Sequence, residues 1–244
     1  MVVKGKIKVA KYYENKYLAG DYIEDRYTKP LGKLNHVLQI NILNSLIRGF
    51  SCKNVLEIAI GPARIAKDLK GYKKGLGIDN SQQMLGIAAL NLKNKNWELK
   101  KINAFNFSTK NNFDLVYSFK FIRHLNYNER KKIYEVIKKI LTKDALFVLD
   151  VPNKNVYSRY SKKYPSLVYD EYWDLDEINK EFIENNFVVY KVYPILKHFK
   201  IQELISKLSK FKFLNSLLYF TLKLIENLPG KNPFEWVFVL KKAT

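Results

Sequence analysis

The sequence predicts an α/β fold with a doubly wound, mostly parallel sheet of seven strands. Short apolar runs alternate with helical patterns along most of the 244 residues, and this alternation is typical of a parallel sheet with helices on both faces. The first run, 55–60, is followed directly by Gly61 and Pro62, as expected of a buried strand that ends in a tight turn.

Each element follows from its own local pattern. Apolar residues at helical spacing predict an amphipathic helix over 33–49. Ser81 is a suitable N-cap for a helix that follows the second strand. Strands are predicted at 55–60, 75–79, 98–102, 114–118, 145–151, 187–193 and 235–241. Further helices are predicted at 63–70, 81–92, 128–141 and 176–185.

One segment interrupts this rhythm. About 40 residues separate the last two predicted strands, too many for an ordinary connection, and they contain two apolar helical patterns. We therefore divide the chain into an N-terminal arm or lid (1–32), a main α/β domain (33–194 and 233–244) and a helical insertion (195–232). Arm and insertion are expected to shape a substrate pocket, because additions at the carboxyl ends of strands usually do.

Composition excludes several classes of protein. Hydrophobic residues make up 47% of the chain, which argues against disorder. Cys52 is the only cysteine, so neither an internal disulfide nor a metal cluster built on several cysteines can form. The first residues lack an apolar signal core and no uncharged run is long enough to span a bilayer, so we expect a cytoplasmic protein.

The chain is strongly basic, with a formal charge of +20. Such an excess suggests an anionic partner, either nucleic acid, a membrane surface or a phosphorylated substrate. The alternative is that the lysines, which are spread along the chain, follow from the codon bias of the source or from a hot habitat.

The first two predicted strands each contain one acidic residue, Glu57 within the first and Asp79 at the end of the second. Ligands of such sheets bind at the carboxyl ends of the strands, where small residues such as Gly61 allow close approach to the backbone. Glu57 and Asp79 are 79 − 57 = 22 positions apart, close to the spacing of about 20 residues that is typical of adenosine recognition. The helix predicted after Gly61 would offer free N–H groups to a carboxylate.

These motifs, in this order, resemble the class I S-adenosylmethionine-dependent methyltransferases, in particular their small-molecule branch. VLEIAIGPARIA resembles the family's first motif, GLGIDNSQQMLGIAA its second strand and helix, and FDLVYSFKFIRHL its fourth strand. The resemblance covers about 17–241 and implies a Rossmann-like domain with an antiparallel last strand and S-adenosylmethionine as methyl donor. It places these residues in the donor site: Tyr22, Arg26, Glu57, Ala59, Gly61, Asp79, Asn80, Met84, Asn103, Ala104, Phe105 and Ser118.

Within the resemblance, individual residues receive roles. Tyr22 and Arg26 would close over the donor, Met84 would lie against adenine, and Asn103 would meet the adenine amino group. His124, in the loop beside the transferred methyl, is the candidate general base.

The sequence also departs from the family. Ala59 and Ala63 stand where glycine is usual, and Asn103 where aspartate is commoner. A protein that binds the donor without catalysis is therefore one alternative. A nicotinamide-binding domain is disfavoured, because Ala59 and Arg64 break its Gly-x-Gly-x-x-Gly pattern.

The acceptor stays open at this point. A small-molecule or lipid-like acceptor fits the apolar insertion, whose basic residues could rest on an anionic membrane. The alternative is that the insertion buries its apolar face against the domain or a second subunit, as in a homodimer. The charge favours an RNA or protein methyltransferase as a further alternative.

Overall fold

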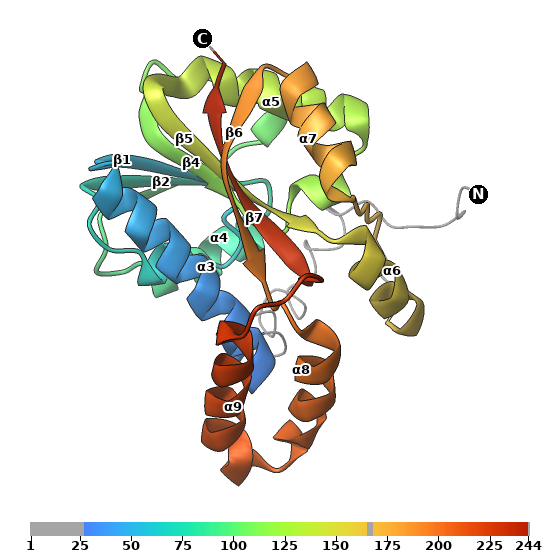
Figure 1. Cartoon of the computed structure of the whole chain (residues 1–244). Coiled ribbons are helices and arrows are strands. Elements are labelled where there is room, and N and C mark those ends of the chain that lie inside the picture. The colour runs from blue at the N-terminus through green and yellow to red at the C-terminus, as the bar shows by residue number, and fades with distance from the viewer. Residues whose placement is uncertain (1–26, 165–167, 244) are drawn as a thin grey trace.

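The structure is a computed structural model that describes residues 27–164 and 168–243 (Figure 1). It contains a seven-stranded sheet in the order β3-β2-β1-β4-β5-β7-β6. Strands β1 to β5 run parallel, and β7 is antiparallel to both of its neighbours, β5 and β6. The predicted fold class is thus confirmed. The strands are β1 (Asn54–Ile58), β2 (Lys74–Asp79), β3 (Trp97–Lys101), β4 (Phe113–Ser118), β5 (Leu141–Pro152), β6 (Phe187–Ile195) and β7 (Glu235–Lys242).

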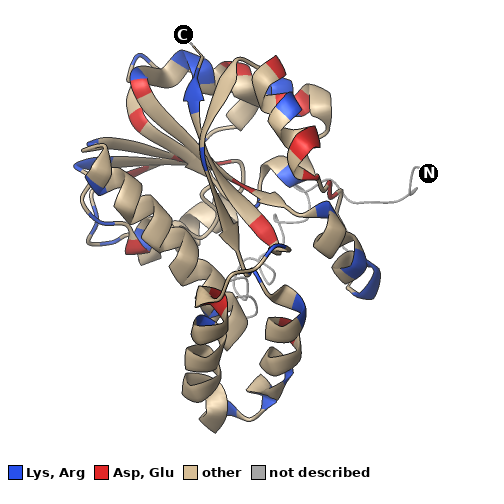
Figure 2. Cartoon of the chain, viewed as in Figure 1, with Lys and Arg blue, Asp and Glu red and all other residues tan. Residues whose placement is uncertain are grey.

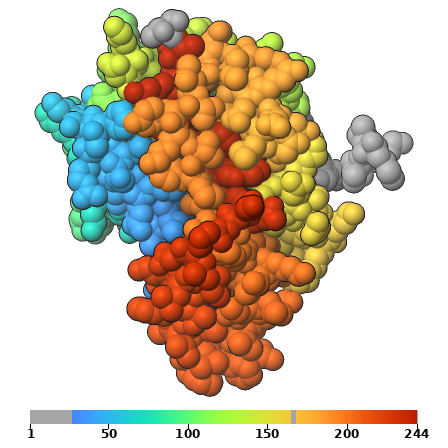
Figure 3. Space-filling view, viewed as in Figure 1, coloured from blue at the N-terminus to red at the C-terminus, as the bar shows by residue number. Residues whose placement is uncertain are grey.

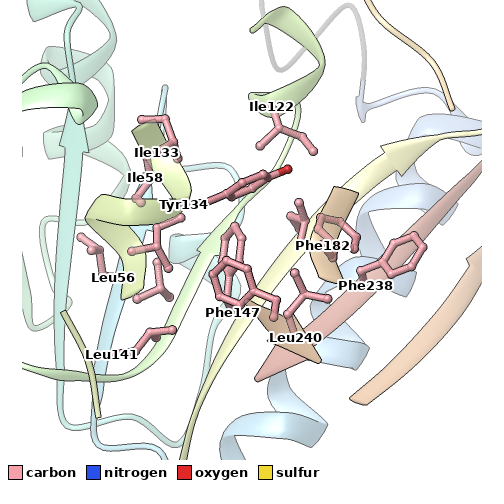
Figure 4. Packing of buried hydrophobic residues seen from close by; sticks show 14 of the residues in the cluster. Leu56, Ile58, Ile122, Ile133, Tyr134, Leu141, Phe147, Phe182, Phe238 and Leu240 are labelled. Atoms are coloured by element: carbon pink, nitrogen blue, oxygen red, sulfur yellow. The ribbon is translucent and has the colours of Figure 1, made fainter. Parts of the chain in front are cut away.

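Helices cover both faces of the sheet. Their bounds are α3 (Pro30–Gly49), α4 (Gln82–Asn91), α5 (Tyr127–Ile140), α6 (Lys154–Lys163), α7 (Leu175–Glu184), α8 (Phe199–Ser206) and α9 (Asn215–Asn227). On one face, α5 and α7 pack against alternate strand residues, and Tyr134, Phe147 and Phe182 lie at the centre of that layer (Figure 4). On the other face, α3 packs together with residues of α8 and α9.

Most elements lie where the sequence places them, and their ends follow local chemistry. α3 begins at Pro30, a proline in the first turn, three residues before the predicted start. Ser81 caps α4 by accepting from the Met84 backbone N–H, as predicted. α6, which follows an Asn153 cap, was not predicted.

The predicted helix over 63–70 is wrong. These residues form turns and a short 3-10 segment, Ala66–Asp68. Ala59, Gly61 and Ala63 all have positive φ, between 54° and 59°, and a right-handed helix cannot begin through such residues. The expectation that a helix N-terminus there receives a carboxylate falls with it.

The insertion is a helical hairpin, α8 and α9, that extends beyond the sheet (Figures 1 and 3). It leaves the end of β6 and returns at the start of β7. Because β7 is antiparallel to β5, the hairpin lies at the edge where the parallel strands have their carboxyl ends.

Candidate functional site

A cavity of about 600 Å³, the first cavity, lies at the carboxyl ends of β1, β2 and β4. Its size is in the range of about 300–1,000 Å³ that is usual for ligand pockets. It brings together ten of the residues predicted from the sequence: Glu57, Ala59, Gly61, Asp79, Asn80, Met84, Asn103, Ala104, Phe105 and His124.

Three predicted residues are not brought to this cavity. Ser118 is buried, and its hydroxyl donates to the Ile58 carbonyl at 2.8 Å, which ties β4 to the end of β1. Ser118 does not line the first cavity. Tyr22 and Arg26 lie outside the described residues.

The loop after β1 has an unusual backbone. Gly61 has a φ of 54°, and a Cβ added there would point into open space. Ala59 and Ala63 adopt the same left-handed conformation although they carry a Cβ, which costs about 1–2 kcal/mol for each such residue. With alanine in place of glycine at these two positions, the loop keeps its conformation, but the folded protein is less stable.

Asp79, at the end of β2, is held by backbone N–H groups on both sides. Its two oxygens accept from Gly61 and Ser81, each at 2.8 Å. Burial raises the pKa of its carboxyl, and these N–H groups oppose that rise. Since a carboxylate has about four acceptor sites, Asp79 retains the capacity to accept from ligand hydroxyls.

Glu57 lies deeper in the first cavity and is 4% exposed. Its carboxyl accepts from the Tyr117 hydroxyl at 2.9 Å. Burial raises its pKa to about 8, although Tyr117 and the nearby Arg64 oppose the rise. Glu57 is thus largely protonated at neutral pH unless a cation lies beside it.

A second cavity, of about 890 Å³, adjoins the first. Lys120 and His124 line both. The walls of the second cavity come mainly from α3, α6 and the insertion, and aromatic side chains dominate them: Tyr27, Tyr157, Tyr160, Tyr164, Phe199 and Phe234.

Positive charge prevails in the second cavity. Four of its charged residues are paired: Arg123 and Asp170 with each other, Glu203 with Lys163, and Lys120 with Asp150 and Glu235. Lys29, Lys207 and Lys210 also line it. None of these three lysines forms an ion pair with another residue in the part of the chain that the structure describes.

His124 has a defined tautomer. Its Nδ1 lies 2.8 Å from the Tyr169 carbonyl oxygen, which can only accept, so Nδ1 carries the proton and Nε2 has a free lone pair. Burial and the neighbouring Arg123 lower its pKa, against the opposing effect of Asp170. The imidazole is therefore neutral at pH 7 and able to accept a proton.

Lys120, at the wall between the cavities, was not singled out from the sequence. Its Nζ lies 2.8 Å from Asp150 and forms a second ion pair with Glu235. Burial opposes its charge, but the two carboxylates outweigh burial and raise its pKa. The available signal was one acid in each of two otherwise apolar stretches, Asp150 near the end of β5 and Glu235 at the start of β7.

Comparison with known proteins agrees with this geometry. Residues 55–144 match the family described as "Methyltransferase domain". Over these residues the chain carries a class I S-adenosylmethionine-dependent methyltransferase domain. No curated protein matches the sequence.

Solved methyltransferases share the fold over nearly the whole chain. One is an S-adenosylmethionine-dependent enzyme from Clostridium acetobutylicum, with a TM-score of 0.65, 12% identity and coverage of 94% of this chain and 100% of that one. The N-methyltransferase NodS from Bradyrhizobium japonicum, solved with S-adenosylhomocysteine, has a TM-score of 0.67, 13% identity and coverage of 98% and 100%.

A third similar structure is phosphoethanolamine N-methyltransferase 2 from Haemonchus contortus, in complex with phosphomonomethylethanolamine and S-adenosylhomocysteine. It has a TM-score of 0.67, 20% identity and coverage of 100% of this chain and 61% of that one. Among the described helices of the present methyltransferase, none combines the length and apolar composition needed to cross a membrane.

Proposed function

We propose that this methyltransferase binds S-adenosylmethionine in the first cavity and methylates a small, anionic, lipid-like molecule held in the second. The observation that carries the proposal is that the two cavities meet at Lys120 and His124. A methyl transfer needs donor and acceptor in line and about 3 Å apart, and two adjoining cavities that share lining residues support such an arrangement.

The residues of the first cavity fit the donor. Asp79 is placed to accept from the ribose hydroxyls, and Met84 and Phe105 are apolar surfaces for the adenine. Glu57 would face the amino group of the methionine part, whose positive charge would stabilise the ionised carboxylate. The open space above Gly61 allows the donor to approach the backbone. Asn103 and Asn80 are exposed polar groups at the rim.

The reaction requires little covalent chemistry from the protein. When bound, S-adenosylmethionine supplies an electrophilic methyl group, whose bond to sulfur breaks with the electron pair remaining on sulfur. Nε2 of His124 receives the proton that the acceptor's hydroxyl or amine loses as its new bond to carbon forms. Lys120 keeps its charge throughout, because two carboxylates hold it, and so serves as a positioning residue.

The second cavity favours an acceptor with an anionic group and an apolar part. Its three lysines, which have no carboxylate partner among residues 27–164 and 168–243, suit a phosphate or carboxylate. Its tyrosines and phenylalanines suit an apolar or sugar-like body. The Haemonchus enzyme, whose ligand carries a phosphate, is consistent with this chemistry. We further propose that the arm (1–32) and the insertion (195–232) enclose the acceptor, since Lys29 and Lys207 line this cavity.

Transfer of a radiolabelled methyl group tests the proposal. The protein is incubated with labelled S-adenosylmethionine and a cell extract, and label is counted in lipid, small-molecule, RNA and protein fractions. Label in lipids or small anionic molecules is the expected result. Label confined to RNA or protein would refute the proposed acceptor class, and donor binding without any transfer would indicate a non-catalytic binding protein.

A pair of variants then locates the acceptor. Lys207→Ala should raise KM for the labelled acceptor about tenfold, the usual effect of losing one charge-assisted hydrogen bond, and leave the Kd of the donor unchanged. Lys110→Ala is the matched control, because this lysine is exposed, lies outside the insertion and lines neither cavity. Equal KM values for the two variants would contradict the placement of the acceptor.

A further inference from the structure

The α8–α9 hairpin has a large exposed apolar surface that does not pack against the rest of the domain. The exposed residues form one stripe on each helix and a tip between them, with exposed fractions from 45% to 83%. They are Ile201, Leu204, Leu208, Phe211, Phe213, Leu217, Phe220, Leu224 and Leu228. An apolar surface of this extent is uncommon on a soluble protein unless it binds something.

The rest of each helix accounts for the hairpin's attachment to the domain. Leu218 and Leu222 are buried, and Leu222 belongs to the core layer that includes α3. Gln202, fully buried, donates to Glu226 at 2.9 Å and joins the two helices. The exposed stripes are therefore free of these internal contacts and available to an external partner.

The charge of the hairpin selects the partner. Between Glu203 and Glu226 there is no acidic residue, whereas Lys207, Lys210, Lys212 and Lys223 are present and exposed. Glu203 is paired with Lys163, and Glu226 is buried and accepts from Gln202 and the Lys197 backbone. Figure 2 shows basic residues at the tip and along the sides of the hairpin, and acidic residues only nearer the domain.

We infer that the hairpin docks on an anionic lipid surface, with Phe211 and Phe213 entering the headgroup region and the lysines contacting lipid phosphates. Aromatic residues beside lysines suit that interface, where apolar burial and attraction to anionic lipid add together. A second copy of the chain fits less well, because a symmetric contact would bring lysines of the same sign together. Neither helix crosses the bilayer in this arrangement.

Docking would also place the second cavity close to the lipid. Lys207 and Lys210, which precede the tip, line that cavity, so an amphipathic acceptor could pass from the surface into it. The docking itself does not depend on the proposed function, because it requires neither the donor nor the acceptor.

Flotation with lipid vesicles tests the inference. The full-length protein is mixed with vesicles of phosphatidylcholine alone or with 30% phosphatidylglycerol (about one anionic lipid in three, enough for a strong surface potential). We expect binding to the anionic vesicles only, and we expect it to weaken as salt concentration rises. Equal binding to both kinds of vesicle, or binding to neither, would overturn the inference.

Variants at the tip make the test specific. Phe211→Ser with Phe213→Ser, and separately Lys212→Glu, should each reduce vesicle affinity about tenfold or more. Leu90→Ser and Lys110→Glu are matched controls, because both residues are exposed but lie far from the insertion in sequence and outside both cavities. Retained binding by the tip variants would refute the docking site.

Two further measurements separate the outcomes. Donor binding by calorimetry should be the same for wild type and tip variants, because Phe211, Phe213 and Lys212 line neither cavity. Absence of donor binding in the wild type would contradict the proposed function but would not affect the inference that the hairpin docks on lipid.

Light scattering gives the oligomeric state. A wild-type dimer that the tip variants convert to a monomer would show that a second copy covers this surface instead.

Discussion

The ammonium group of Lys120 lies 2.8 Å from the carboxylate of Asp150, at the wall shared by the two cavities. A second ion pair with Glu235 extends the contact across β7, and Glu235 in turn accepts from Gln39 of α3 at 2.8 Å. Lys120 thereby links β5 to β7, and Glu235 links β7 to α3, beside the two cavities.

Replacing Lys120 by methionine should destabilise the protein strongly. Two buried carboxylates would lose their cation, and breaking a buried ion pair in this way costs about 3–5 kcal/mol. Urea unfolding measures the loss. Lys100→Met is the matched control, because its pair with Glu98 is exposed and is worth about 0–1 kcal/mol. Similar losses for both variants would contradict the role given to Lys120.

Glu57 should make stability depend on pH. The folded-state pKa of about 8 lies above the ordinary value of 4.5 for a glutamate, so the folded protein retains a proton that the unfolded chain releases. Stability is therefore lost as pH rises through the window from about 4.5 to about 8, by about 1.4 kcal/mol for each unit of pKa difference. Glu57→Gln should lose less stability than wild type between pH 6 and pH 9, as measured by thermal unfolding without donor. Parallel pH profiles for the two proteins would show that Glu57 is ionised in the fold.

His124→Gln should lower kcat by about 10²–10⁴-fold, the usual contribution of a general base. The Kd of the donor should change far less. Because burial lowers the pKa of His124 from 6.5, wild-type kcat should stay constant near pH 7 and fall only below pH 6.5, as the imidazole becomes protonated. A glutamine variant with the same pH profile and rate as wild type would leave His124 as a structural residue.

Ala59→Gly should stabilise the fold and improve donor binding. Glycine adopts the φ of 57° seen at this position without steric cost, and the gain should reach about 0.5–1 kcal/mol after the entropy of the unfolded chain is included. Ala59 lines the first cavity, so removal of its methyl group also gives the donor more room. Thermal unfolding and calorimetry measure the two effects. Lower stability in the variant would show that the alanine side chain contributes more by packing than it costs by strain.

The fold was predictable because its signals are local. The alternation of apolar runs and helical patterns locates each of the seven strands. Asp79, at the end of β2, was identified by its distance of 22 positions from Glu57. The ten predicted residues that line the first cavity come from just such segments, at the ends of adjacent strands.

What could not be predicted depends on contacts between distant residues. Asp150 and Glu235 are 30 and 115 positions from Lys120, so nothing local identifies their ion pairs. The segment after Gly61 has the composition of a helix, but it forms turns because Ala59, Gly61 and Ala63 have positive φ. Arg64 in this segment donates to Gln39 of α3 at 2.8 Å, a contact between residues distant in sequence. The sequence of the insertion indicates two apolar helices, but only the structure shows which of their apolar residues are exposed.

The most direct test of the central claim is a calorimetric titration of the wild type and Asp79→Asn with S-adenosylmethionine. Asp174→Asn, at the cap of α7, is the control for loss of a capping carboxylate. We expect micromolar binding by wild type and control, and a Kd at least tenfold higher for Asp79→Asn, a difference of about 1.4 kcal/mol. Absence of binding by a folded wild type, or an unchanged Kd in the variant, would contradict the donor site described above.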